Sequence, residues 1–295
     1  MQLLRMRGRT LALDEPRIMG VLNVTPDSFS DGGRFLDATA AVKHARRLAV
    51  EGADIIDVGG QSSRPGAEEV TVEEELRRVL PVVKTLLEEL DLAISIDTYR
   101  SAVAEAALRQ GVHLVNDITA LADPAMADLV ARKEAGLVLM HMQGTPRTMQ
   151  LAPHYDDVVS EIRSFLAERA ERALAVGVSP QAILIDPGIG FGKTVEHNLE
   201  ILRRLREFGE LGYPLLVGTS RKSFIGQVLG VPVEERLVGS LASVVVARLE
   251  GATVFRVHDV AETRQVLTLT EALLRGGRRE PAPARANSPR PAEKG

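Results

Sequence analysis

Residues 92–117 read LAISIDTYRSAVAEAALRQGVHLVND, in which a short apolar run, a helical stretch and a second apolar run follow one another. Short runs rich in Ile, Leu and Val are typical of buried strands, and apolar residues every three or four positions indicate a helix. Gly111 directly after the periodic stretch is the expected helix stop. This stretch therefore predicts a strand, a helix and the next strand.

The same alternation occurs eight times between residues 18 and 257. The predicted strands are Ile18–Val24, Asp54–Val58, Ala93–Asp97, His113–Asn116, Gly136–His141, Ala182–Asp186, Pro214–Thr219 and Thr253–Val257. Eight such units in about 260 residues match the size of a (β/α)8 barrel, and apolar strands suit a parallel sheet covered by helices. The predicted fold class is α/β, a (β/α)8 TIM barrel, with an open doubly wound sheet as the alternative.

Both ends of the chain differ from this repeat. Residues 1–14 place apolar side chains around an Arg-Gly turn and predict an N-terminal β-hairpin that covers the barrel floor. Residues 276–295 carry four Pro and no Val, Ile, Leu, Met or aromatic residue, so they cannot bury enough surface to offset the ordering entropy. We expect one domain over residues 1–275 and a disordered, Pro-rich tail over 276–295.

The composition describes a globular chain without an overall positive field. Its 295 residues are 45% hydrophobic and 26% charged, and 36 Lys and Arg against 40 Asp and Glu give a net charge of −4. A nucleic-acid partner or an acidic membrane surface is therefore disfavoured. The absence of Cys excludes disulfides, thiolate metal sites and thiol nucleophiles. No apolar run is long enough to span a membrane, and Arg interrupts the N-terminus, which favours a cytoplasmic protein.

Polar side chains end every predicted strand. They are Asn23, Asp57, Asp97, Asn116 with Asp117, His141, Asp186, the run Ser220–Lys222, and Arg256 with His258 and Asp259. Any one of the Asp, Asn or Ser residues could simply cap the following helix. Arg, Lys and His are not capping residues, however, and in this fold all strand ends meet at the mouth that holds the active site. We therefore expect a binding site there.

The charges at this mouth favour two kinds of ligand group. Strands seven and eight end in SRK and RVHD, which gather cationic and imidazole groups suited to a phosphate or pyrophosphate. Asp97 and Asp186 suit a ligand edge with guanidine-like N–H groups. The run PGIGFGKT at 187–194 resembles a phosphate-binding P-loop, but Pro187 replaces the first Gly, so a P-loop nucleotidase remains only an alternative. Residues 23–35 form a Gly-rich loop that we expect to act as a lid, and the similar loop at 59–71 is either functional or a plain solvent loop.

Several of these segments together resemble one family, the dihydropteroate synthases. The resemblance is carried by IMGVLNVTPDSFSDGG, DVGGQSSRPGAEEV, ISIDTYR, LVNDITA, LMHMQGTPRTMQ, LIDPGIGFGKT, LVGTSRKSFIG and FRVHDV, in order from residue 18 to residue 260. It implies a transferase of folate biosynthesis that joins 4-aminobenzoate to 6-hydroxymethyl-7,8-dihydropterin pyrophosphate and releases pyrophosphate. It also implies Mg²⁺, a homodimer and a target for sulfonamides.

The resemblance assigns roles residue by residue. The pterin pocket is expected from Asp97, Asn116, Met140, Asp186, Phe191 and Lys222. The pyrophosphate site is expected from Asn23, Ser63, Arg64, Arg256 and His258, with Asn23 also on Mg²⁺. The aminobenzoate site is expected from Ser63, Arg64, Phe191, Ser220 and Arg221. The catalytic set is expected to be Asp97 and Lys222 together with the lid residues Asp27, Ser28, Phe29 and Arg64.

These roles suggest a dissociative reaction in which Asp97 stabilises a cationic pterin. Gln61 and Ser63 stand where the family more usually has Glu and Thr, which changes a charge and a methyl group in the second lid loop. Two alternatives remain open. A methyltetrahydrofolate-dependent methyltransferase would share the pterin pocket but has no pyrophosphate to hold, and a non-catalytic pterin-binding paralogue could dispense with the lids.

Overall fold

Eight parallel strands form the centre of the molecule, in a computed structural model that describes residues 2–25, 33–62 and 69–276, with the backbone alone described over 33–37. In hydrogen-bonded order the strands are β8 (Ile183–Asp186), β7 (Gly136–Met140), β6 (Leu114–Asp117), β5 (Ala93–Asp97), β4 (Ile55–Gly59), β3 (Arg17–Asn23), β10 (Val254–Val257) and β9 (Leu216–Val217). A parallel bridge between Ile185 and Leu215 closes the sheet between β8 and the residue that precedes β9. The predicted barrel is confirmed, and the doubly wound alternative is wrong.

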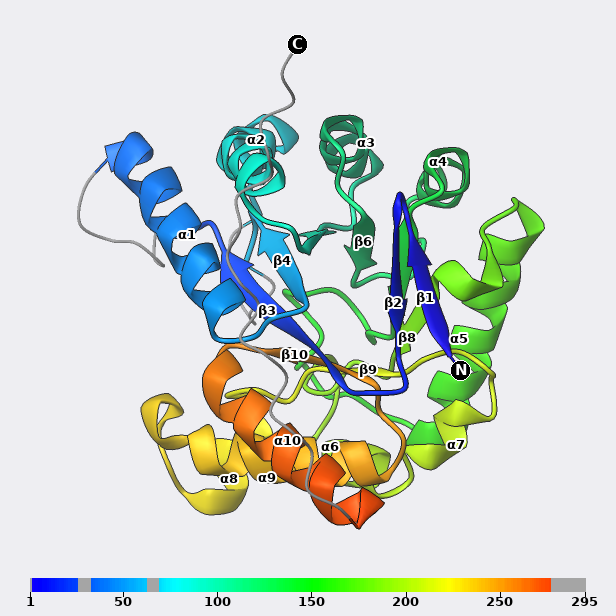
Figure 1. Ribbon diagram of the computed structural model, residues 1–295. Coiled ribbons are helices and arrows are strands. Elements are labelled where there is room, and N and C mark those ends of the chain that lie inside the picture. The colour runs from blue at the N-terminus through cyan, green and yellow to red at the C-terminus, as the bar shows by residue number, and fades with distance from the viewer. Residues whose placement is uncertain (1, 26–32, 63–68, 277–295) are drawn as a thin grey trace.

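Helices surround this sheet in Figure 1. They are α1 (Gly33–Val50), α2 (Val72–Glu89), α3 (Ser101–Gln110), α4 (Met126–Lys133), α5 (Val158–Ala175), α6 (Val195–Arg203), α7 (Arg206–Gly209), α8 (Ser223–Leu229), α9 (Leu237–Leu249) and α10 (Val260–Arg275), with short 3-10 turns at Pro180–Ala182 and Val233–Glu235. The predicted strand Pro214–Thr219 is correct only at Leu216–Val217, because the chain turns after Gly218 and Lys222 N donates to Thr219 O.

Local sequence signals set the helix ends. At the start of α2, Thr71 accepts a hydrogen bond from Glu74 N at 3.2 Å, and acidic residues in the first turn suit the helix dipole. At the end of α3, Gly111 has φ +115°, a left-handed conformation that L side chains rarely adopt. Thr71 and Gly111 thus mark where α2 begins and where α3 ends.

The N-terminal hairpin closes one end of the barrel. Strands β1 (Leu3–Met6) and β2 (Arg9–Ala12) pair antiparallel. Leu4 and Met6 are buried against inward-facing residues near the strand starts, such as Met19 and Ile55. Gly136 allows this approach, because a Cβ there would lie 2.9 Å from Met6 Cγ. The predicted hairpin at the barrel floor is confirmed.

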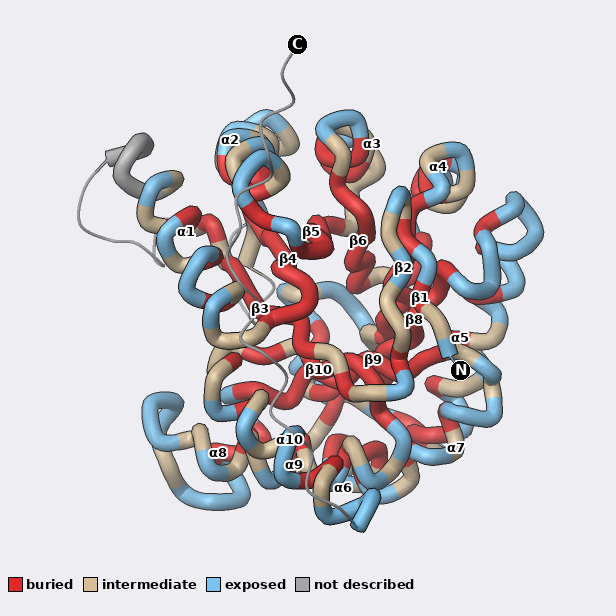
Figure 2. The backbone as a smooth tube through the Cα atoms, in the orientation of Figure 1, coloured by how far each residue is buried: buried red, intermediate tan, exposed pale blue. Residues whose placement is uncertain are grey.

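Alternate strand residues serve two separate cores. Met19, Ile55 and Ala93 point into the barrel with the hairpin, whereas their neighbours Ile18 and Ile56 pack under the helices. Figure 2 shows the barrel strands largely buried along their length, while the helices expose one face. No helix in the described part of the chain is long and apolar enough to cross a membrane. Most of the predicted tail, residues 277–295, lies outside the described residues.

Candidate active site

Strand register carries the predicted polar residues to one edge of the sheet. Asn23 pairs with Gly59, Gly59 pairs with Asp97, and Asp97 pairs with Asn116, each across neighbouring parallel strands. Met140 pairs in the same way with Asp186. Because parallel strands end at the same side of a barrel, these residues meet at the mouth opposite the hairpin.

A chain of charges lies just inside this mouth. Arg256 Nε is 2.7 Å from Asp57 Oδ2, and its Nη2 is 2.7 Å from Asp97 Oδ2. Asn116 Nδ2 donates to the same Asp57 oxygen at 2.9 Å. The carboxylates of Asp57 and Asp97 thus share the single guanidinium of Arg256. Because Asp57 is fully buried, this contact is largely shielded from water. The mouth is therefore preorganised by its own charges.

Burial and these contacts shift the pKa values of Asp97 and Arg256. Burial raises the pKa of Asp97 to about 7, despite the opposing effect of the Arg256 charge beside it. Burial alone would lower the pKa of Arg256, but Asp57 and Asp97 raise it above its usual value, so this guanidinium stays charged. Asp97 can therefore change charge near neutral pH while Arg256 cannot.

A second cluster joins Asp186 to Lys222. Asp186 Oδ1 accepts a hydrogen bond from Gly188 N at 2.7 Å, and burial raises the pKa of the carboxyl. Lys222 Nζ lies 4.5 Å from the centre of the Phe191 ring and donates to Ile189 O. Burial lowers the pKa of Lys222 to about 8, although the nearby Asp186 charge opposes that shift. The charge of Arg256 also acts on Lys222, so the two clusters share one site.

The residues after strands β9 and β10 form a third group. Ser220 Oγ lies 3.1 Å from His258 Nδ1, and His258 N donates to the same hydroxyl at 3.2 Å. Arg221 has φ +58° and its Nε donates to Asp259 at 3.0 Å, with nearly half of its side chain exposed. Ser220 and His258 therefore belong to one hydrogen-bonded pair, while Arg221 is turned toward Asp259.

The structure describes only part of the two loops that were predicted to act as lids. The predicted residues Asp27, Ser28, Phe29, Ser63 and Arg64 lie outside the described residues. Gln61 is described, and its Nε2 donates to Tyr99 Oη at 3.1 Å. Tyr99 in turn donates to Glu69 at 3.1 Å, so the unusual Gln61 is tied to the loop that follows β5.

Two polar residues near the mouth were not predicted as site residues. Asp57 ends a predicted strand like the others, and only its contacts with Arg256 and Asn116 distinguish it. Lys193 lies in the PGIGFGKT run, and its side chain is buried against the end of β7. Asp117, by contrast, accepts from Thr119 and Leu121 backbone N–H groups and so stabilises a turn. No feature of the sequence distinguishes the roles of Asp57, Lys193 and Asp117.

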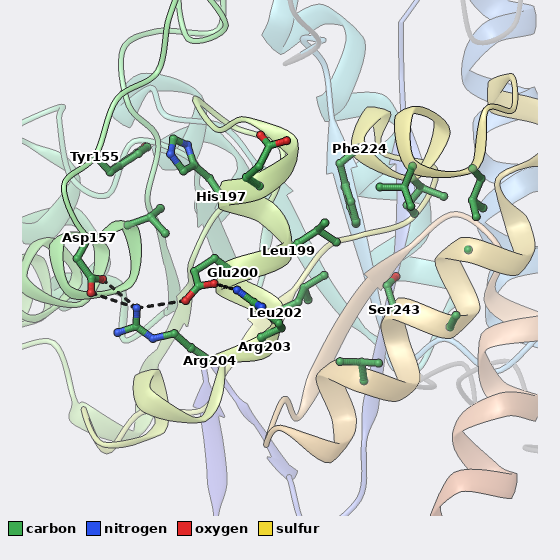
Figure 3. A pocket seen from close by; sticks show the side chains of 18 of the residues that line it. Tyr155, Asp157, His197, Leu199, Glu200, Leu202, Arg203, Arg204, Phe224 and Ser243 are labelled. Atoms are coloured by element: carbon green, nitrogen blue, oxygen red, sulfur yellow. Dashed lines mark hydrogen bonds and ion pairs between the residues drawn. The ribbon is translucent and has the colours of Figure 1, made fainter.

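A further concave surface of the described residues lies away from this mouth. A groove of about 820 Å³ lies outside the barrel among α6, α8, α9 and the segment before α5. Figure 3 shows its apolar side chains, including Leu199, Leu202 and Phe224, beside an ion pair of Arg204 with Asp157 at 3.1 Å. The groove therefore lies among the outer helices, away from the strand ends.

Comparison with known proteins identifies the family to which the chain belongs. Residues 19–258 match the family model described as pterin binding enzyme. The chain is 49% identical over 268 residues to the dihydropteroate synthase of Escherichia coli strain K12, covering 91% of this chain and 95% of that protein. It belongs to the dihydropteroate synthase family.

Solved structures of family members share the whole fold. The dihydropteroate synthase of Yersinia pestis, solved as a sulfonamide drug complex, has a TM-score of 0.88 at 46% identity and covers 93% of this chain and 100% of its own. The enzyme of Xanthomonas albilineans, solved with 4-aminobenzoic acid, has a TM-score of 0.87 at 47% identity and covers 92% and 99%. The family identified from the sequence motifs is thus confirmed.

Proposed function

We propose that this chain joins the pterinylmethyl group of 6-hydroxymethyl-7,8-dihydropterin pyrophosphate to the amine of 4-aminobenzoate. As a dihydropteroate synthase it is a transferase of folate biosynthesis. The observation that supports the residue roles most strongly is the shared guanidinium of Arg256, which lies between Asp57 and Asp97 at the mouth.

Recognition of the pterin follows from the hydrogen-bonding groups at the mouth. The carboxylate of Asp186 would accept N–H groups from the 2-amino edge of the ring, a charge-assisted contact. Asn116 already donates to Asp57, which leaves its carbonyl oxygen to accept a ring N–H. Lys222 would donate to the ring carbonyl, with Phe191 and Met140 as the apolar walls. This arrangement favours a donor-rich aminopyrimidinone over other flat rings.

The pyrophosphate would lie toward Asn23, His258, Arg256 and the lid residues Ser63 and Arg64. Arg256 supplies fixed positive charge close to the strand ends. Asn23 offers a neutral amide oxygen, a donor that suits Mg²⁺ shared with phosphate oxygens. The described residues contain no group of three acidic, His or Cys ligands, which fits a cation held mainly by the substrate. Bound Mg²⁺ would neutralise charge on the leaving group.

The reaction that fits these groups is dissociative. The C–O bond to pyrophosphate breaks first, and its electron pair leaves with the phosphate while a cation forms over the pterin and its methylene carbon. Asp97, as carboxylate, stabilises this cation, so its contribution is largest in the transition state. The neutral aromatic amine then attacks the methylene carbon and releases a proton to solvent, so no general base is needed to activate it.

The aminobenzoate would lie between the lids and the loop after β9. Phe191 would form one wall, with Ser220 and Arg221 at its edge and Ser63 and Arg64 above it. Asp27, Ser28 and Phe29 of the first lid would close the site and exclude water from the cation. Ser63 keeps the hydroxyl of the Thr that is more usual in the family, and Gln61 is held by its hydrogen bond to Tyr99.

A pyrophosphate-release assay tests the function directly. Purified protein, Mg²⁺ and the pterin pyrophosphate are incubated with and without 4-aminobenzoate, and dihydropteroate is identified by mass. Product that requires aminobenzoate supports the proposal. Pyrophosphate without condensed product would mean that the pocket ionises its substrate for another nucleophile, and pterin binding without reaction would favour a non-catalytic paralogue.

We also propose that the chain forms a homodimer through α9 and α10. These adjacent helices expose Val238, Leu249, Leu269, Leu273 and Leu274, by 48% or more of each residue. Exposed apolar residues on two adjacent helices favour burial against a second copy. Light scattering after size exclusion should give twice the 31.9 kDa chain mass, and a Val238→Glu, Leu273→Glu double variant should give the monomer. A monomeric wild type at micromolar concentration would contradict this.

A further inference from the structure

The loop between β8 and α6 is held by side chains along its whole length. The carbonyl oxygens of Ile189, Gly190, Phe191 and Gly192 accept hydrogen bonds from Lys222, Gln150, Lys193 and Tyr155, in that order. A loop whose consecutive carbonyls are all bonded to side chains has little freedom to change shape.

The glycines of this loop show how closely it packs on the end of β7. Gly188 has φ +70°, and a Cβ there would overlap the carbonyl oxygen of His141. Gly192 has φ +62°, and a Cβ there would lie 2.6 Å from Gln143 O. At these two positions glycine lets the loop lie directly against other backbone atoms. This explains why the loop is rich in glycine although it does not fit the P-loop pattern.

Lys193 is the buried part of this arrangement. Only 3% of the residue is exposed. Its Nζ lies 2.8 Å from Phe191 O, 3.1 Å from His141 Nδ1 and 3.4 Å from His141 O. Among the described residues, no carboxylate forms an ion pair with it. A lysine buried on three neutral acceptors is unusual, because burial without an opposite charge is costly.

The three acceptors that Lys193 contacts are uncharged, while the nearby charges of Asp186 and Lys222 act on its pKa in opposite directions. Burial lowers the pKa of Lys193 well below its usual value, and burial with Lys193 lowers the pKa of His141 to about 2. The His141 ring is packed edge-on against Phe165 at 5.0 Å and lies near Tyr155 at 6.0 Å. Lys193 is therefore buried, and its amine is directed at His141 and at the carbonyl of Phe191.

The loop connects this lysine to the proposed pterin pocket. Lys193 bonds the carbonyl of Phe191, whose ring lies 4.5 Å from Lys222 Nζ. Lys222 also donates to Ile189 O, and a Cβ on Gly190 would lie 2.9 Å from Lys222 Cδ. The position of Lys222 is thus set by three consecutive residues of a loop that Lys193 ties to β7.

We propose that Lys193 is a positioning residue, which anchors the loop 187–193 to the end of β7 and so fixes Phe191 and Lys222 around the pterin ring. Tyr155 assists by holding the next carbonyl, that of Gly192, at 2.7 Å. This rests on the proposed function for the identity of the ring. The anchoring itself depends only on the contacts above.

The test compares Lys193→Met with Lys84→Met, the same change at an exposed position of α2. Loss of the anchoring hydrogen bonds should raise the KM for pterin pyrophosphate and the Kd for 6-hydroxymethyl-7,8-dihydropterin about tenfold, with kcat changed less than about threefold. Tyr155→Phe should move both constants in the same direction by a smaller factor. Lys84→Met should leave them unchanged.

Three results would overturn the proposal. One is a folded Lys193→Met protein that binds the pterin like wild type. Another is an equal rise in KM for Val130→Ala, a buried change on α4 far from the loop in sequence, because that would indicate a general loss of stability. The third applies if Lys193→Met does not fold. In that case, a Tyr155→Phe protein that binds the pterin with wild-type affinity would overturn the proposal. A wild type that binds pterin without making dihydropteroate would refute the synthase function but leave the Kd comparison valid.

Discussion

At the floor of the barrel, Leu4 and Met6 pack on inward side chains such as Met19, whereas at the mouth the same strands present Asp97 and Arg256 to one another. The floor is held by apolar burial, which is additive and tolerates changes of similar volume. The mouth is held by charges that depend on each other, because removal of one leaves another buried and unpaired. Stability and chemistry are therefore separated along each strand by only a few residues.

This difference predicts that single changes at the two ends have opposite signatures. A mouth variant that keeps the shape and the hydrogen-bonding groups, such as an amide in place of a carboxylate, should lose catalysis while the fold persists, because the apolar floor still holds the barrel. A floor variant should lose stability while the kinetic constants persist. The experiments below test this separation of stability from catalysis, in order from the largest expected free-energy effect to the smallest.

Asp97→Asn is expected to have the largest effect. The amide keeps the shape but cannot oppose the cation that forms as pyrophosphate leaves, so kcat should fall about 10³-fold, or about 4 kcal/mol. The KM for pterin pyrophosphate should change less than about threefold, because the carboxylate acts mainly in the transition state. Steady-state kinetics with thermal unfolding as the folding check measures both. Equal losses in kcat and affinity would refute the dissociative mechanism.

Leu4→Ala tests the other end of the barrel. Leu4 is fully buried between the hairpin and the strand starts, so its truncation should destabilise the fold by about 3 kcal/mol. The kinetic constants at a temperature well below unfolding should stay at wild-type values. Denaturant unfolding gives the free energy, and Val50→Ala, at a 73% exposed position on α1, is the control with an expected change below about 0.5 kcal/mol. A raised KM in Leu4→Ala would show that the floor shapes the pocket.

The pH profile of kcat/KM should reveal the two shifted groups at the mouth. As pH falls through about 7, Asp97 gains a proton, and the neutral carboxyl no longer stabilises the pterin cation. As pH rises through about 8, the ammonium group of Lys222 loses a proton and with it the positive charge. The profile should be bell-shaped, about sevenfold lower at pH 6 and at pH 9 than at its maximum near pH 7.5. Asp97→Asn should abolish the acid limb and keep the alkaline one. An acid limb that survives in that variant would assign it to another group.

The sequence predicted the barrel well because the eight repeats express local rules. Apolar strand runs, periodic helices and Gly stops each require only neighbouring residues, and parallel register then brings Asn23, Asp97 and Asn116 together without further information. The hairpin at the floor followed from its apolar residues in the same way. The short β9 did not, because its end depends on the turn between Thr219 and Lys222.

The contacts between side chains at the mouth could not be predicted from the sequence. Arg256 was expected on pyrophosphate, and its sharing by Asp57 and Asp97 depends on side chains from three separate strands. Lys193 looked like part of a phosphate loop, and only its burial against His141 shows otherwise. Pairings between residues more than a hundred positions apart leave no periodic trace, so coordinates are needed to find them.

Ser95→Ala, the smallest expected effect, locates the boundary between floor and mouth. Ser95 lies on β5 between inward Ala93 and Asp97, pairs in register with Asp57, and is fully buried. Among the described residues its Oγ has no hydrogen-bond partner. Removal of a buried hydroxyl without a partner relieves its desolvation penalty, so stability should stay within about 1 kcal/mol of wild type or increase, with kcat and KM unchanged. A loss of pterin affinity in a folded Ser95→Ala protein would instead mean that the ligand reaches this hydroxyl, and that the chemical part of the barrel begins one layer deeper than Asp97.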